Sequence, residues 1–270
     1  MKTKQTIRAA AAGLALVLIA GTPAVLNAAE AITEPAAEAK QDAKAIEILE
    51  KSIEAGGGAE AFKSVGYSMQ SGSMSVPAMG ITGTMKTYQK SPDKFLLVLN
   101  FEGIGEQRQG LNEGVAWSSD AMSGPRVLPE EEAVTVKREA DVAARLDFKS
   151  DYPTIEYVGE TTFDGKAAHE IRTLDTEGNE ATEYYSTESY HLLGSVRSVP
   201  SPMGAIDTTT YLRDYKKYGE LTQPTTIVQK IGPTQIEIKI NSVSYDKFDE
   251  EIFELPAAIK TIVESSKEEG

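Results

Sequence analysis

The chain has 270 residues with 27 Lys and Arg against 41 Asp and Glu, so its formal net charge is -14, and it contains no cysteine. The negative charge argues against nucleic-acid binding, which needs a basic surface to displace counterions from phosphate. The absence of cysteine excludes thiol catalysis, zinc–cysteine sites, disulfides and an N-terminal lipidated cysteine. Hydrophobic residues make up 40% of the chain, which is enough for a folded core.

The N-terminus has the order of features of a secretory signal peptide. Three basic residues precede an apolar run over residues 9–20, and the stretch closes on small residues at Ala28. We assign residues 1–28 to a signal peptide and expect the mature protein in the periplasm, with an uncleaved membrane anchor as the alternative. Residues 29–41 are rich in Ala, Glu, Pro and Thr without apolar periodicity, which predicts a flexible leader.

A first helix is predicted directly after this leader. Asp42 can cap its first turn, and three consecutive glycines at 56–58 end it. Its apolar side chains recur at helical spacing, at Ile46, Leu49 and Ile53. A short helical turn over residues 59–65 is expected before the strands begin.

A second helix is predicted from Pro129 to Leu146. Pro129 suits the first helical position, and three glutamates at 130–132 lie near the positive end of the helix dipole. Val134, Val142 and Leu146 would form its apolar side. A metal site at the glutamates is the alternative interpretation, which helix-start electrostatics makes unnecessary.

The chain between and after these helices is predicted to form strands. Runs of about 8 to 12 residues from Tyr67 onward alternate with turn signals such as Asp164-Gly165, which is typical of an antiparallel meander. We expect nine to eleven strands whose sheet is covered on one face by the helices. The predicted fold class is α+β, mainly antiparallel β, in one domain over residues 42–257 with a C-terminal tail over 258–270.

Several apolar positions are candidates for ligand binding. Alternation places four large side chains of the run 95–101 on one face, and three isoleucines of the run 236–240 on one face. Similar turns at 77–81 and 202–206 each place a flexible methionine beside a glycine, and a third methionine, Met122, lies in the loop before Gly124-Pro125. These positions are either ordinary core and tight turns or the lining of a cavity for an apolar ligand. The candidate lining is Phe95, Leu97, Leu99, Phe101, Trp117, Met79, Met203, Ile236, Ile238 and Ile240.

Patterns for catalysis or metal binding are sparse. His169 and His191 lie on different predicted strands and have no partner at a recognised spacing. The sequence has no nucleophile elbow and no P-loop, and the acidic stretch 175–179 lacks the closing glutamate of a calcium loop. We therefore expect no enzymatic activity, no cofactor and no metal. A hydrolase that uses the histidines is the alternative from that class.

Several motifs follow one another in an order that resembles a known family. They are Ala55-Gly-Gly-Gly58, Gly80-Ile-Thr-Gly83, Lys90-Ser-Pro-Asp-Lys-Phe95, Arg108-Gln-Gly110, Gly114-Val-Ala-Trp117, Gly124-Pro-Arg126, Leu221-Thr-Gln-Pro224 and Phe253-Glu-Leu-Pro256. The family is the periplasmic outer-membrane lipoprotein-sorting proteins, with the LolA/LolB-like fold. The resemblance covers about residues 44–256.

The resemblance implies an incomplete, half-open antiparallel β-barrel of about ten strands that is covered by helices and encloses a hydrophobic cavity for acyl chains. It implies a non-enzymatic carrier whose partners are lipid or an acylated lipoprotein and membrane transporter or receptor proteins, and we expect a monomer. Arg108 is the nearest match to the functional arginine of the sorting carrier. The Ser-rich strand at 68–75 and the acidic surface depart from that carrier. An envelope sensor or protein-interaction module with a filled core is therefore the alternative function.

Overall fold

The structure is a computed structural model that describes residues 40–176, 178–199 and 206–268. The predicted signal peptide, most of the predicted leader and Met203 lie outside the described residues. The last two residues of the leader form β1 (Lys40–Gln41), which pairs in parallel with β8 (Thr154–Phe163).

Fourteen strands of the described chain form one sheet, and two more form a small separate sheet. The other strands of the large sheet are β2 (Tyr67–Val76), β3 (Ile81–Lys90), β4 (Lys94–Phe101), β5 (Gly105–Asn112), β6 (Val115–Asp120), β7 (Gly124–Val127), β9 (Lys166–Leu174), β10 (Glu180–Ser186), β11 (Leu192–Val199), β12 (Ile206–Arg213), β15 (Thr226–Ile231) and β16 (Thr234–Ser244). The small sheet contains β13 (Lys216–Tyr218) and β14 (Leu221–Gln223). The expected nine to eleven strands were too few, because stretches such as 105–127 contain three short strands joined by tight turns.

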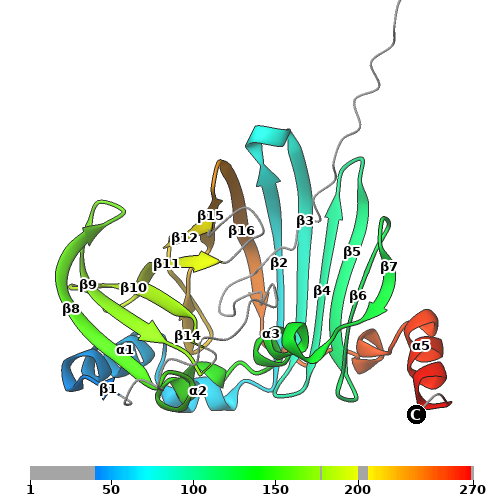
Figure 1. Cartoon of the computed structure of the whole chain (residues 1–270), viewed down its shortest axis with the longest axis horizontal. Coiled ribbons are helices and arrows are strands. Elements are labelled where there is room, and N and C mark those ends of the chain that lie inside the picture. The colour runs from blue at the N-terminus through cyan, green and yellow to red at the C-terminus, as the bar shows by residue number, and fades with distance from the viewer. Residues whose placement is uncertain (1–39, 177, 200–205, 269–270) are drawn as a thin grey trace, which may run out of the picture.

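The large sheet is open. Its order is β1-β8-β9-β10-β11-β12-β15-β16-β2-β3-β4-β5-β6-β7, and every neighbouring pair except β1 and β8 is antiparallel. In the described chain β1 and β7 are the two edges, so the sheet does not close into a barrel. Figure 1 shows the sheet strongly bent, with β8 and β7 on opposite sides. The predicted mainly antiparallel, half-open α+β fold is confirmed.

One face of the sheet can be followed through the register of its strands, because directly paired residues of antiparallel strands point to the same side. A continuous row of paired residues runs through Ile171, Glu183, Ser195, Thr210, Gln229 and Ile236. Both ends of this row are apolar and buried, and its middle is polar. We call the face that carries this row the inner face and the opposite one the outer face.

Helix α1 (Ala43–Ala55) covers the inner face at β8 to β10. The Asp42 carboxylate accepts a hydrogen bond from the Lys44 amide at 2.8 Å, which confirms the predicted cap. Leu49 is buried as the spacing predicts, and Ile48 is fully buried beside it. Helix α2 (Ala59–Ser64) follows Gly58, where the short turn was expected.

We expect an Asp42→Ala substitution to lower the free energy of unfolding by about 1 kcal/mol, because one amide at the start of α1 loses its only side-chain acceptor. Urea denaturation of the purified protein would measure this change. Asp42→Asn keeps the acceptor and serves as the control. Equal stability of the Ala variant and the wild type would show that the cap does not contribute.

The predicted helix 129–146 is divided. Helix α3 (Glu130–Ala140) ends at Asp141, which is extended with φ -102° and ψ 108°. The remainder forms the 3-10 turn η2 (Ala144–Asp147) and the short helix α4 (Phe148–Asp151). The Asp141 carboxylate accepts hydrogen bonds from Ser91 Oγ at 2.8 Å and from the Ala143 amide at 2.9 Å, and these contacts hold the break.

The outer face is covered near β4 and β6 by the C-terminal segment. The turn η3 (Glu250–Phe253) and helix α5 (Ala257–Glu268) pack Phe253, Leu255 and Ile259 against Leu96 and Trp117. Most of the predicted tail 258–270 is therefore helix α5. A further 3-10 turn, η1 (Pro77–Met79), joins β2 to β3. Within the described chain, each helix is too short or too polar to cross a membrane.

Candidate functional site

The inner face carries the largest apolar cluster among the described residues. Phe95, Leu97, Leu99 and Phe101 of β4 each expose only 3–4% of their surface and belong to this cluster, as the alternation of the run predicts. The register pairs Phe95 with Leu111 of β5, so the apolar surface continues across the neighbouring strand. We call this cluster the inner-face core.

The three isoleucines predicted near the C-terminus lie in the same cluster. Ile236, Ile238 and Ile240 of β16 are 1–7% exposed, and Ile238 pairs with Met74 of β2. The structure therefore brings together seven of the ten predicted ligand-binding residues, from strands far apart in the sequence. The full cluster of buried residues is Met74, Val76, Met85, Phe95, Leu97, Leu99, Phe101, Leu111, Ala116, Leu128, Ala133, Val136, Ala140, Leu212, Ile227, Ile236, Ile238 and Ile240.

The other three predicted residues are not in this cluster. Trp117 is buried, but it lies on the outer face beneath α5, where the absence of a side chain at Gly110 makes room for its ring. A Cβ at Gly110 would come within 2.7 Å of that ring. Met79 is 56% exposed at the tip of the β2–β3 hairpin, and Met203 lies outside the described residues. The sequence could not place Trp117, because alternation assigns residues to two faces without saying what covers each face.

Helix α3 covers part of the inner-face core with small side chains. Its buried residues are Ala133, Val136 and Ala140, whereas Val134, on the predicted apolar side, is 44% exposed. The predicted phase of this helix was therefore wrong. Figure 1 shows α3 against one end of the strands.

Polar contacts fix the two ends of α3. At its start, Arg126 donates two hydrogen bonds to the Glu132 carboxylate, at 2.9 and 2.6 Å. At its end, Gln89 Nε2 donates to the carbonyl oxygen of Glu139 at 2.5 Å, and Arg138 forms an ion pair with Asp151 at 2.7 Å. Helix α3 is thus fixed by polar contacts at its two ends. It contributes few large apolar side chains to the inner-face core.

Glu139 of α3 is a functional candidate that the sequence analysis missed. Its Oε1 atom is buried and has no hydrogen-bond partner in the described structure. Burial raises the pKa of Glu139 well above the ordinary value of a glutamate, against a smaller opposing effect of Arg138. Nothing in the local sequence distinguishes this glutamate from its exposed neighbours. A buried carboxyl oxygen without a hydrogen-bond partner costs free energy, so Glu139 destabilises the observed position of α3.

A second apolar cluster continues the inner face beneath α1. Ala45, Ile48 and Leu49 of α1 pack on Ile155 and Ile171 of the sheet. Leu192 contacts both this cluster and the inner-face core. Between them the paired row is polar, so the inner face offers two apolar regions separated by hydrogen-bonding groups.

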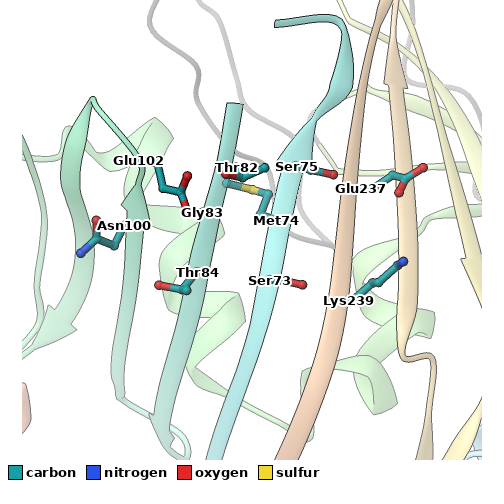
Figure 2. A pocket seen from close by; sticks show the side chains of 10 residues that line it. All are labelled: Ser73, Met74, Ser75, Thr82, Gly83, Thr84, Asn100, Glu102, Glu237 and Lys239. Carbon is teal, nitrogen blue, oxygen red and sulfur yellow. The ribbon is translucent and has the colours of Figure 1, made fainter. Parts of the chain in front are cut away.

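The outer face contains a hollow of about 500 Å³ that is lined mostly by polar residue types. Figure 2 shows its lining, which consists of Ser73, Met74, Ser75, Thr82, Gly83, Thr84, Asn100, Glu102, Glu237 and Lys239. Ser73 and Ser75 alternate with Met74 along β2, so the hollow lies on the side opposite to the inner-face core. It is distinct from the predicted apolar site. Arg108 also lies on the outer face, because it pairs with Val98, and its Nε is 2.6 Å from Glu106 Oε1.

The two histidines are packed side chains in separate places. His169, on β9, is 5% exposed, and its Nδ1 lies 3.5 Å from the hydroxyl oxygen of Tyr157. His191 precedes β11, instead of lying on a strand, and its ring stacks on Tyr215 at a centroid distance of 4.2 Å. Burial lowers the pKa of both imidazoles, because it disfavours their charged form. No group of three metal-ligating side chains occurs among the described residues.

The fold resembles solved structures, although no protein-family model and no curated protein matches the sequence. A LolA superfamily protein from Nitrosomonas europaea is 13% identical with a TM-score of 0.54, over 78% of this chain and 97% of that one. A DUF1329 family protein from Desulfovibrio piger is 12% identical with a TM-score of 0.54, over 78% and 97% of the two chains.

A third similar structure is a putative outer membrane lipoprotein-sorting protein domain from Vibrio parahaemolyticus. It is 13% identical with a TM-score of 0.51, over 81% of this chain and 99% of that one. The open antiparallel sheet, its helical cover and these likenesses agree, and the chain therefore has the LolA-like fold.

Proposed function

We propose that this protein is an exported, non-enzymatic carrier that binds the acyl chains of a lipid or lipoprotein on its inner face, beneath α3. The observation that carries the proposal is the inner-face core, which combines side chains from β2 to β6, β12, β15 and β16 into one apolar surface under a small helix. Burying an acyl chain there would contribute on the order of 10 kcal/mol of favourable binding free energy before ordering costs, at about 0.8 kcal/mol per methylene. Binding of this strength needs no chemical step.

Loading requires α3 to move. In the observed position of α3, which we call closed, the core residues of β4, a strand that α3 contacts, are 3–4% exposed, so a guest reaches them only if α3 moves. The buried side chains of α3 are small, and the buried Glu139 carboxyl opposes closure. An acyl chain that binds the open form would shift the population toward it.

The likeness to a lipoprotein-sorting domain and the sequence of the N-terminus support the location and the partners. We place the mature protein, from about residue 29, in the periplasm, where its folded domain receives an acylated cargo from a membrane transporter and delivers it to a receptor. Residues 1–28 are removed as a signal peptide.

We expect the protein purified from the cell envelope to carry lipid. Native mass spectrometry should show a lipid adduct that organic extraction removes, and the emptied protein should bind a fluorescent fatty-acid probe that added fatty acid displaces. Recovery of the protein free of lipid, together with no probe binding, would contradict the proposal.

An envelope sensor or protein-interaction module is the second candidate. It is favoured by the burial of Phe95, Leu97 and Leu99, which pack within one cluster of the protein's own side chains. In that case the inner-face core is ordinary core, and the probe would not bind even at saturating concentration.

A further inference from the structure

Three hairpins that turn at the same end of the sheet each expose one large apolar side chain at the tip. Met79 lies at the β2–β3 tip and is 56% exposed, Ile104 lies at the β4–β5 tip and is 43% exposed, and Met122 lies at the β6–β7 tip and is 67% exposed. Figure 1 shows these three tips at the upper ends of their strands, at stepwise lower heights from β2–β3 to β6–β7 and away from α1, α2 and α3. We call Met79, Ile104 and Met122 the apolar rim.

Ordered turns hold these side chains outward. At the first tip, the Gly80 amide donates to the Pro77 carbonyl at 3.1 Å, and Gly80 has the left-handed conformation that suits glycine. At the third tip, the Asp120 carboxylate accepts hydrogen bonds from the amides of Met122 and Ser123, at 2.8 and 2.7 Å. A turn of this kind fixes the direction of the exposed side chain before any partner arrives, which reduces the entropy lost on binding.

The rim forms a line. The strand order β2-β3-β4-β5-β6-β7 places each tip two strands from the next. With neighbouring strands about 4.8 Å apart, successive tips lie about 10 Å apart across the sheet, and the register places each tip two residues, about 7 Å, further back along the strands than the one before. Three separate side chains at this spacing leave polar backbone between them.

The rim borders one end of the inner-face core. Val76 directly precedes the first tip and Phe101 lies just before the second, and both belong to the inner-face core. The Ser91–Asp141 hydrogen bond places the end of α3 at the β3–β4 turn, which is the opposite end of the same strands. A guest that entered past the rim would therefore meet the apolar core at the end away from this anchor, and α3 would still have to move to make room for it.

We propose that the apolar rim docks this protein on the surface of a zwitterionic lipid bilayer, with the three side chains inserted between headgroups. The proposal rests on the proposed carrier function, because docking there would place this end of the inner-face core against the source of acyl chains. A lipid interface is fluid and can close around single apolar side chains on separate tips. A preformed protein surface instead needs a contiguous apolar patch, so the rim suits a bilayer better.

The charges near the rim select the kind of bilayer. Arg108 is paired with Glu106 and Arg126 with Glu132, which leaves Glu102 and Asp120 as the local excess. The capping hydrogen bonds lower the pKa of Asp120, so it is ionised at neutral pH. These carboxylates complement the ammonium group of a zwitterionic headgroup. They would be repelled by an anionic bilayer, and by the same carboxylates of a second copy of this chain.

Vesicle co-sedimentation of the whole protein, in the form that the cell produces, tests the proposal. The vesicles contain phosphatidylethanolamine and phosphatidylcholine, and a second set contains added phosphatidylglycerol. We expect the wild type to bind the zwitterionic set, and the triple variant Met79→Ser, Ile104→Ser, Met122→Ser to bind it at least about tenfold more weakly. Val158→Ser, which removes a 49% exposed side chain of β8 outside the rim, is the control and should bind like the wild type.

Three results would overturn the proposal. The triple variant could bind like the wild type, the wild type could bind only vesicles that contain phosphatidylglycerol, or sedimentation could show a dimer that the triple variant loses. The fatty-acid probe assay on the same samples separates the two hypotheses. Normal probe binding without vesicle binding would refute only the docking of the rim on a bilayer. Vesicle binding without probe binding would refute only the carrier function.

Discussion

Oxidation of a Ser91→Cys/Asp141→Cys variant is expected to abolish acyl-chain uptake, and reduction is expected to restore it. Ser91 Oγ donates to Asp141 Oδ1 at 2.8 Å and so joins the β3–β4 turn to the end of α3. A disulfide in place of this hydrogen bond would keep α3 over the inner-face core. Because the chain has no cysteine, the introduced pair is the only disulfide that can form. The fluorescent fatty-acid probe measures uptake before and after addition of dithiothreitol.

A second engineered pair provides the matched control. The hydroxyl oxygens of Ser71 and Ser242 lie 2.7 Å apart, between β2 and β16 and away from α3. Ser71→Cys/Ser242→Cys should form a disulfide without changing uptake. Full uptake by the oxidised Ser91→Cys/Asp141→Cys protein would show that α3 does not need to leave this end of the sheet, and the proposed route beneath it would be wrong.

The second large effect is expected from Glu139→Gln, which should raise the free energy of unfolding at pH 7 by about 1–3 kcal/mol. The pKa of Glu139 is higher in the folded protein than in the unfolded chain, because the carboxylate is desolvated. As the pH rises above about 4.5, the unfolded chain releases this proton while the folded chain retains it, so the wild type loses stability until the pH passes the raised pKa. The variant lacks this loss, and its advantage therefore grows with pH.

Urea denaturation between pH 5.5 and 8 would measure this difference while staying above the isoelectric point near 4.7. Glu130→Gln, on the same helix but with a side chain that is 76% exposed, is the control and should change stability little. We also expect Glu139→Gln to slow probe uptake, because it stabilises the closed position of α3. An advantage that is independent of pH would show that the buried carboxyl does not titrate differently in the two states.

The sequence alone determined the features that depend on neighbouring residues. Asp42 and the glycines at 56–58 bound α1 because capping and left-handed turns are local properties of the backbone. The alternation of residues 95–101 and of Ile236, Ile238 and Ile240 identified two apolar strand faces, because side chains change sides at every residue. The order of the motifs then predicted the LolA-like fold, which the solved structures confirm.

The tertiary structure decided what covers each face. Trp117 and Leu97 both occupy apolar strand positions, but only the position of α5 shows that Trp117 belongs to the outer face. Helix α3 ends early because Asp141 accepts a hydrogen bond from Ser91, 50 residues away in the chain. The sequence near Asp141 gives no indication of that contact. The burial of Glu139 likewise depends on where α3 lies. Local rules fix which side chains share a face, whereas pairing of distant segments fixes what each face meets.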